Sequence, residues 1–155
     1  MIFIAHRGNL NGPRIDLENN PQYINEALDL GFNVEVDIWY VNNQFLLGHD
    51  EPIYPTDIEW LSKRSGLLWI HCKDKTSLEE LHLLNRQSNT FNFFWHENDL
   101  ATLTSKGYIW ALPGKQPIKN AIAVMPELYN DNVSACIGIC SDFIVKYKNS
   151  MNLNK

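Results

Sequence analysis

Two kinds of segment alternate along this chain, and the pattern of hydrophobic and polar positions separates them. Short apolar runs, rich in β-branched and aromatic residues, are divided by stretches with helical spacing or by clusters of Asn, Gly and Pro. Apolar runs of this composition, bounded by turn residues, predict β-strands. The predicted strands are residues 1–5, 33–41, 45–50, 67–73, 91–96, 108–112, 121–125 and 143–147.

The intervening segments carry helix signals. Asn20 and Pro21 predict the N-cap and the first residue of a helix that stops at Gly31. Because strand, helix and strand follow one another over residues 1–41, we expect parallel pairing with a right-handed crossover. Three further helices are predicted, over 56–62 with Thr56 as cap, after the capping pair Thr76-Ser77, and from Asp99 to 106–107.

The segment 33–50 predicts a β-hairpin that carries two acids. The Asn-Asn pair at 42–43 reads as a tight turn, so the numbers of paired residues add up to about 85. Strand alternation puts Glu35 and Asp37 on one face, and the hairpin returns His49 to their side. Buried carboxylates are costly unless cations meet them, which favours a site at this face. The alternative is a surface hairpin with solvated acids.

Several predicted strands change from apolar to polar at their C-terminal ends, where α/β folds collect their active-site residues. These ends carry His6-Arg7-Gly8, His49-Asp50, His71-Cys72-Lys73 and His96. The chain has room for about eight strands but only three or four helices. We therefore predict an α/β fold, a reduced (β/α)8 barrel of the TIM type with several helices shortened or missing. The domain is expected to span 1–148, with 149–155 as a polar tail.

Composition narrows the classes of function. A length of 155 residues fits one domain with a full core. A net charge of −5 without a basic block argues against nucleic-acid binding. The three cysteines have no metal-type spacing, which predicts reduced thiols and a cytoplasmic location. No apolar run is long enough for a signal peptide or a membrane span, and the oligomeric state stays open.

The residues at the strand ends suggest phosphodiester chemistry. Glu35 and Asp37 supply the hard oxygen ligands that Mg²⁺ or Ca²⁺ prefers. His6 and His49 are candidates for general acid and base, because an unperturbed histidine titrates near neutral pH. Arg7 and Lys73 complete the set as cations that could bind a phosphate. An arginine binds phosphate through two parallel N–H groups and a lysine as a point charge.

Four motifs in order, Ile4-Ala5-His6-Arg7-Gly8, Glu18-Asn19, Glu35-Val36-Asp37 and Leu47-Gly48-His49-Asp50, resemble the glycerophosphodiester phosphodiesterase family of the phosphatidylinositol phospholipase C-like superfamily. The resemblance covers residues 2–50 and thins afterwards to 71–73 and 140–143. It implies a metal-dependent hydrolase of a small-molecule or lipid-derived phosphodiester. His6 and His49 would exchange protons with the attacking and leaving oxygens. Glu35 and Asp37 would hold the divalent cation, and Arg7 and Lys73 would bind the phosphate.

The chain departs from the family pattern at the third metal ligand. The family carries Glu-x-Lys where this chain has His71-Cys72-Lys73. The third ligand is therefore His71 or is absent, and the ion would be Mg²⁺, Ca²⁺ or Mn²⁺. A histidine ligand favours a softer ion such as Mn²⁺ or Zn²⁺ over Ca²⁺.

Aromatic residues predict a substrate wall beside the acids. Trp39 shares a face with the two carboxylates by alternation, while His96 and Trp110 lie near predicted strand ends. An aromatic wall would cover the apolar part of a small alcohol or a choline-like cation. For Trp95 and Trp110, packing inside the barrel is the alternative.

Two other functions remain open at this stage. A catalytically inactive barrel could keep the cleft for a phosphorylated ligand, as the histidine at the third ligand position suggests. A lyase of the same superfamily would let a substrate hydroxyl attack and release a cyclic phosphate. Metal chelation separates a hydrolase from a binding module, and the phosphorus NMR spectrum of the product separates a hydrolase from a lyase.

Overall fold

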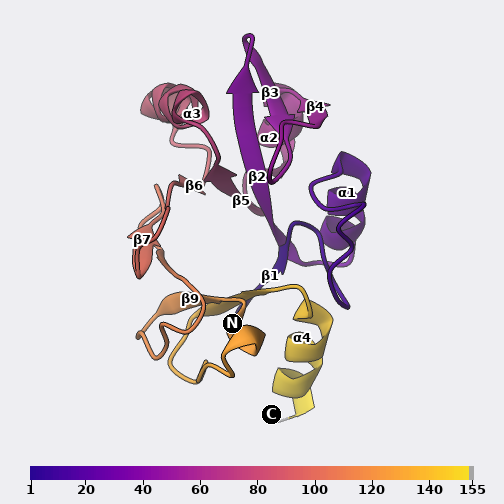
Figure 1. The fold of residues 1–155 in the computed structure, drawn as a ribbon, viewed down its shortest axis with the longest axis vertical. Coiled ribbons are helices and arrows are strands. Elements are labelled where there is room, and N and C mark those ends of the chain that lie inside the picture. The colour runs from indigo at the N-terminus through magenta and orange to yellow at the C-terminus, as the bar shows by residue number, and fades with distance from the viewer. Residues whose placement is uncertain (154–155) are drawn as a thin grey trace.

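The computed structural model describes residues 1–153 and has a mixed α/β architecture built on one curled ten-stranded sheet (Figure 1). The strands are β1 (Ile2–His6), β2 (Asn33–Val41), β3 (Gln44–Leu47), β4 (Tyr54–Thr56), β5 (Leu68–Cys72), β6 (Phe93–Phe94), β7 (Ala101–Leu103), β8 (Ile109–Ala111), β9 (Ala121–Val124) and β10 (Gly138–Ser141). The helices are α1 (Pro21–Asp29), α2 (Ile58–Arg64), α3 (Lys75–Ser88) and α4 (Ile144–Leu153), with a 3-10 turn η1 (Pro126–Leu128).

Eight of the ten strands curl around a common interior, while β3 and β4 extend the sheet from β2; the order of the eight is β6-β5-β2-β1-β10-β9-β8-β7. The first seven of these run parallel, and β7 returns antiparallel to β8. The α/β class predicted from the sequence is confirmed. Within residues 1–153 no strand pairing joins β6 to β7 or β8, so the sheet curls without the continuous ladder of a closed barrel.

The hairpin predicted over 33–50 is confirmed in its register. Val41 pairs with Gln44 and Ile38 with Leu47, which is the constant sum of 85. Asn42 and Asn43 adopt φ values of 52° and 61°, as a two-residue hairpin turn requires. Strand β2 is long enough to pair with β1 and β5 through its first half and with β3 through its second.

Alternate residues of the strands fill the interior of the curled sheet. The buried cluster there is apolar and takes one or two residues from each contributing strand: Ile4, Trp69, Phe94, Trp110, Ile122, Val124 and Cys140. Two residues further along most of these strands the side chain becomes polar, at positions such as His6 and His71. The interior is therefore an apolar layer beneath a polar one.

The helices lie outside the strands and bury their apolar stripes against them (Figure 1). In α1, Ile24 and Ala27 are fully buried, and Asn20 caps the helix by accepting a hydrogen bond from the Gln22 amide. This confirms the predicted start at Pro21. Within the described chain no α-helix lies between β6 and β10. Among residues 1–153, no helix has the length and apolar character needed to cross a membrane.

Two helix starts differ from the prediction because another residue provides the cap. The predicted helix over 56–62 begins at Ile58, since the carboxylate of Asp57 accepts from the Trp60 amide while Thr56 belongs to β4. Likewise Asp74 caps α3, so this helix begins before the expected Thr76-Ser77 cap. Aspartate accepts from the free amides at least as well as threonine does.

The last third of the chain contains two wrong predictions. The segment 101–103, expected in a short helix from Asp99, is strand β7 because it pairs with β8. The segment 143–147, expected as the last strand, starts helix α4, which continues to Leu153 and takes in most of the predicted tail 149–155; residues 154–155 lie outside the described residues. The true closing strand is β10, where Gly138 fits because a Cβ would meet the Ile122 side chain at 2.7 Å.

Replacing Gly48 with alanine should destabilise the fold. Gly48 has φ of +150°, and a Cβ there would lie 2.0 Å from the Glu51 carbonyl oxygen. We expect Gly48→Ala to lower the free energy of unfolding by at least about 1–3 kcal/mol in a denaturant titration. Gly66→Ala is the control, since nothing lies within 4 Å of its added Cβ, and its effect should stay within about 1 kcal/mol. Equal effects would contradict this account of Gly48.

Candidate active site

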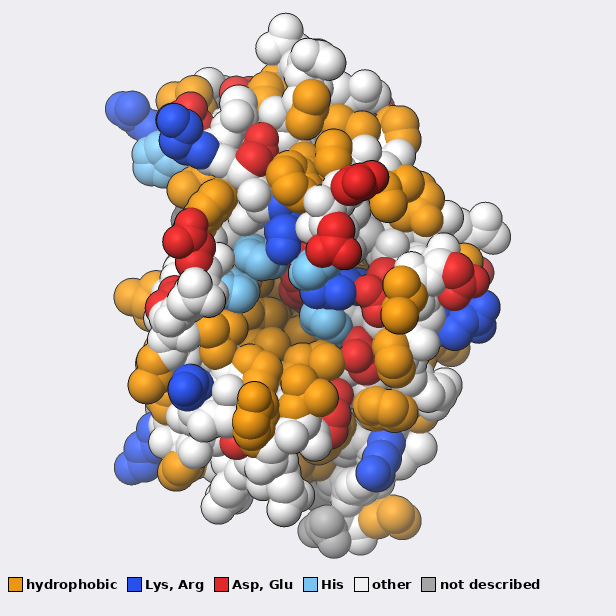
Figure 2. Space-filling model, viewed as in Figure 1, with side chains coloured by type: hydrophobic (Ala, Val, Ile, Leu, Met, Phe, Trp, Pro, Cys, Tyr) orange, Lys and Arg blue, Asp and Glu red, His pale blue; other side chains and the backbone are white. Residues whose placement is uncertain are grey.

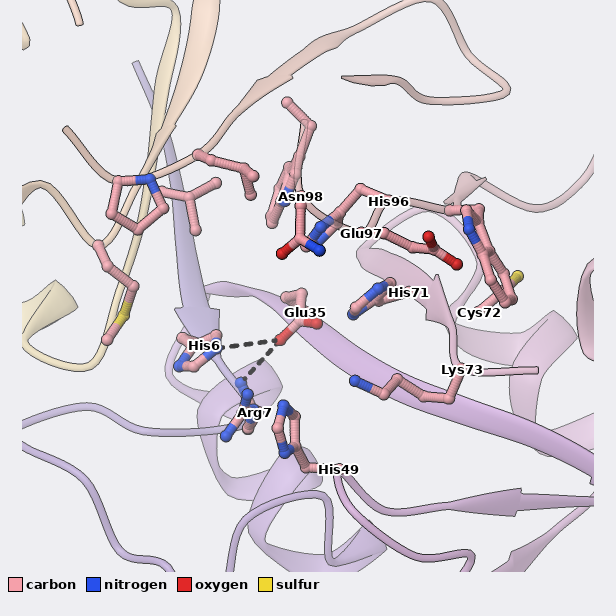
Figure 3. A pocket seen from close by; sticks show the side chains of 16 residues that line it. His6, Arg7, Glu35, His49, His71, Cys72, Lys73, His96, Glu97 and Asn98 are labelled. Atoms are coloured by element: carbon pink, nitrogen blue, oxygen red, sulfur yellow. Dashed lines mark hydrogen bonds and ion pairs between the residues drawn. The ribbon is translucent and has the colours of Figure 1, made fainter. Parts of the chain in front are cut away.

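A pocket of about 620 Å³ opens where the strands end on their C-terminal side (Figure 2). Ten of its lining residues are charged or polar or carry a thiol, and they come mainly from the ends of β1, β5 and β6, from the first half of β2 and from the segment after β3. They are His6, Arg7, Glu35, His49, His71, Cys72, Lys73, His96, Glu97 and Asn98 (Figure 3). The predicted catalytic histidines, phosphate-binding cations and metal ligands Glu35 and His71 thus share one pocket, and Asp37 lies buried directly beneath it.

The turn after β1 aims backbone and side chain of Arg7 at the two acids of β2. Arg7 takes a left-handed φ of 52°, which turns its amide toward the Glu35 carboxylate at 3.3 Å. Gly8 follows at φ 91°, where a Cβ would lie 2.9 Å from the Tyr23 ring. Non-glycine residues in this region of φ concentrate at functional sites.

Asp37 is fully buried and surrounded by donors. Its Oδ1 lies 3.0 Å from Nδ1 of His71 and 3.6 Å from Nζ of Lys73. Its Oδ2 accepts from Asn19 Nδ2 at 2.9 Å and forms an ion pair with Arg7 Nε at 3.1 Å, without the alignment of a hydrogen bond. Burial alone would raise the pKa of Asp37, but the hydrogen bond from His71 and the charge of Arg7 hold that pKa well below its usual range.

Glu35 has the opposite environment, although it lies only two residues away. Its Oε2 contacts the Arg7 amide and lies 3.9 Å from Nε2 of His6, both drawn in Figure 3. Burial and the charge of Asp37 raise the pKa of Glu35. The negative charge of Asp37 is therefore compensated by protein cations, while that of Glu35 is left short of positive charge.

Glu35, Asp37 and His71 form a donor set for a metal ion. One ligand atom from each residue lies within 4.8 Å of the others, and all three residues are buried. The shortage of positive charge at Glu35 is what a divalent cation would supply. Two carboxylates and an imidazole suit Mn²⁺ or Zn²⁺ better than Ca²⁺, which prefers six or more oxygen ligands.

His6 is held by an aspartate that sequence patterns did not single out. Nδ1 of His6 lies 2.8 Å from Oδ1 of Asp142, and the buried Asn9 donates to the same oxygen. Burial alone would lower the pKa of His6, but the hydrogen bond to Asp142 and the charge of Glu35 outweigh it and raise that pKa. The arrangement fixes the ring so that Nε2 is directed toward Glu35 and the pocket (Figure 3).

His49 enters the pocket from the segment after β3, as the hairpin register predicts. Its Nδ1 lies 2.7 Å from Oδ1 of the neighbouring Asp50, and the side chain is 37% exposed. Burial lowers the pKa of His49, although the charge of Asp37 opposes that shift. The pKa values of His6 and His49, the two predicted catalytic histidines, are therefore shifted in opposite directions.

The aromatic residues divide between the pocket and the scaffold. His96 lines the pocket and stacks on His71 with ring centroids 4.3 Å apart, and Trp95 and Trp110 also line it. Trp39 was predicted as a substrate wall, but it does not line this pocket. Its Nε1 donates to the Gly48 carbonyl at 2.6 Å, because the far half of β2 pairs with β3 beyond the parallel strands that curl around the interior.

Supporting residues are the part of the site that sequence reasoning missed. Asn9, Asn19 and Glu18 orient the charged groups. Asn9 Nδ2 and Arg7 Nη1 both donate to Glu18, and Asn19 donates to Asp37. Glu18-Asn19 and Asp142 fall within the motifs that carry the family resemblance, which was the available signal. Cys72, in contrast, is poorly suited to act as a nucleophile, because burial raises the pKa of its thiol to about 12.

The two acids should respond differently to removal of their charge. We expect Glu35→Gln to change the free energy of unfolding of the metal-free protein by less than about 1 kcal/mol, since it removes an uncompensated buried charge. Asp37→Asn should cost about 3–5 kcal/mol, because it leaves buried cations without their partner. Denaturant titrations measure both values, and equal costs would contradict the environments described for the two residues.

The same variants should both lose metal affinity. Calorimetric titration with Mn²⁺ should show a loss exceeding the roughly 10- to 100-fold that removal of a supporting residue causes. Glu59→Gln, on the exposed face of α2, is the matched control and should leave the affinity unchanged. Unchanged affinity in both Glu35→Gln and Asp37→Asn would remove these residues from the metal site.

Replacing Asp142 with asparagine should lower the pKa of His6. NMR titration of the His6 ring in the metal-free protein measures the change, and Asp50→Asn, which acts on His49, is the control. Because the pKa of His6 is raised on folding, its protonation stabilises the fold fully below about pH 6.5, and this contribution is lost as the pH rises through the folded pKa. Asp142→Asn should weaken this dependence; an unshifted His6 titration would show that Asp142 does not control it.

Comparisons of the chain with family models, with curated proteins and with solved structures find no match. The family resemblance carried by the motifs of residues 2–50 therefore stays a prediction. What can be inferred about function rests on the arrangement of side chains in the pocket.

Proposed function

We propose that this protein is a metal-dependent phosphodiester hydrolase acting on a small or lipid-derived phosphodiester, and that its curled sheet is a reduced (β/α)8 barrel. The observation that carries the proposal is one pocket that combines three kinds of group. A buried metal donor set, two histidines fixed by aspartates and two cations converge there. Each kind is common in proteins by itself, but together they match the needs of phosphodiester cleavage.

Phosphate binding is the role that we assign to Arg7 and Lys73. Both line the pocket and lie beside Asp37, at 3.1 Å and 3.6 Å respectively. This carboxylate holds the two cations at the pocket floor and keeps them close together, so that a phosphate meets a prearranged positive surface. Lys73 is the less tightly held of the two and has more freedom to turn toward the ligand.

Proton transfer is the role that we assign to His6 and His49. Asp142 and Asp50 each engage Nδ1 of one ring, which leaves both Nε2 atoms available. One imidazole would take a proton from the attacking water as the other gives a proton to the leaving oxygen. The bound divalent cation, held by Glu35, Asp37 and His71, would polarise the phosphoryl oxygen and stabilise its developing charge.

Hydrolysis should depend on both the metal and the histidines. We expect purified protein with Mn²⁺ to hydrolyse glycerophosphodiesters or bis-p-nitrophenyl phosphate, and His49→Ala to lower kcat by about 10²–10⁴-fold with a smaller change in KM. His82→Ala, on the exposed side of α3, is the matched control and should retain full activity.

Three outcomes separate the proposal from its alternatives. A chelator that removes the metal should abolish turnover, and a cyclic phosphate seen by phosphorus NMR would identify a lyase instead of a hydrolase. Phosphate-ester binding without turnover under Mn²⁺, Mg²⁺ or Ca²⁺ would indicate an inactive binding module. Activity within a few-fold of wild type in His49→Ala would remove that residue from the mechanism.

A further inference from the structure

Along most strands, the inward-facing side chains change from apolar in the core to polar at the pocket, but β8 and β9 do not follow this pattern. In β1, β5, β6 and β10 an apolar inward residue is followed two positions later by a polar one, namely His6, His71, His96 and Asp142. In β8 and β9 both positions stay apolar, because Trp110 is followed by Leu112 and Ile122 by Val124.

These strands give the pocket a continuous apolar side, which we call the β8–β9 face. It consists of Trp110, Leu112, Pro113, Val124 and Met125, all of which line the pocket. None of these side chains has a charge, a hydroxyl or an amide, and the indole of the buried tryptophan has the one N–H among them. A ligand group placed on this face therefore meets carbon and sulfur almost throughout.

The β8–β9 face borders the same hollow as the catalytic groups. Figure 2 shows the pale blue and blue side chains of the histidines and cations along one side of the hollow and orange side chains along the other. Leu112 and Met125 are half-buried, while Trp110 and Val124 lie deeper, at 2% and 7% exposure. Met125 is fixed by a left-handed φ of 46° and by its amide, which donates to the Cys140 carbonyl at 2.8 Å.

We infer that the β8–β9 face selects phosphodiesters in which one ester group is a neutral apolar alcohol, in preference to a polyol such as glycerol. This inference rests on the proposed function, since the phosphate must bind at Arg7, Lys73 and the metal donor set for its ester group to reach this face. Each CH₂ buried there favours binding by roughly fourfold. A hydroxyl on the same surface loses water without gaining a partner.

Binding of two phosphate monoesters that differ only in their hydroxyls tests the inference without requiring turnover. n-Propyl phosphate and glycerol 3-phosphate share charge and carbon count. In calorimetric titrations with Mn²⁺ present, n-propyl phosphate should bind about tenfold more tightly or better. n-Hexyl phosphate should bind more tightly again, and equal affinities for all three would overturn the inference.

Variants that keep the shape of the face but add amides connect the preference to these residues. Leu112→Asn and Met125→Gln are close in volume to the side chains that they replace, and each should reduce the preference for n-propyl phosphate by about tenfold. Leu128→Asn is the matched control, because Leu128 is 60% exposed on η1 and does not line this pocket. An unchanged preference in both pocket variants would assign selectivity to another part of the site.

The outcomes separate the inference from the proposed function. Selective binding of n-propyl phosphate with no turnover of any diester would overturn the hydrolase while supporting the apolar selectivity. Hydrolysis of a diester, with equal affinity for n-propyl phosphate and glycerol 3-phosphate, would support the hydrolase and overturn the apolar selectivity. Tighter binding of phosphocholine than of n-propyl phosphate would also overturn the inference, since it would place the ester group near Trp95 and Glu97, which line the pocket outside the β8–β9 face.

Discussion

The structure depends on burying the Asp37 carboxylate, on the face of a central strand that also carries Glu35. Asp37 lies within reach of two cations, a histidine and an asparagine amide, and these contacts explain why the turns after β1 and β5 take their positions. In a medium of low dielectric constant such a charge is tolerated only with its partners in place. Stability therefore requires several of the groups to which we assign phosphate and metal binding.

The period of two along parallel strands organises the rest of the interior. The same face of each strand places an apolar residue in the core and, two positions later, a residue at the pocket. Six strands contribute to this arrangement, and the change to polar residues occurs in some and not in others. This difference between strands gives the pocket a charged side and an apolar side. The same face of the sheet therefore supplies both the packed core and the polar groups of the pocket.

Local signals were sufficient where neighbouring residues decide the conformation. The Asn42-Asn43 turn fixes the register of the hairpin, and Asn20-Pro21 fixes the start of α1. Local signals failed where a segment is compatible with either a helix or a strand and contacts with distant segments decide between the two. The apolar residues of 143–147 are compatible with a strand or a helix, and the buried position of Ile144 against the sheet favours the helix. Residues 101–103 became a strand because β8 was available to pair with them.

Sequence patterns were enough to predict the α/β class, the paired acids on one face of β2 and the polar residues at or just after strand ends, because period and turn chemistry are properties of adjacent residues. They could not predict that Asp142, 136 positions away, holds His6, or that Trp39 turns to the Gly48 carbonyl instead of the pocket. Such contacts depend on the curl of the sheet and on the direction of each side chain. A one-dimensional pattern records neither of these, because both arise from packing between segments that are distant along the chain.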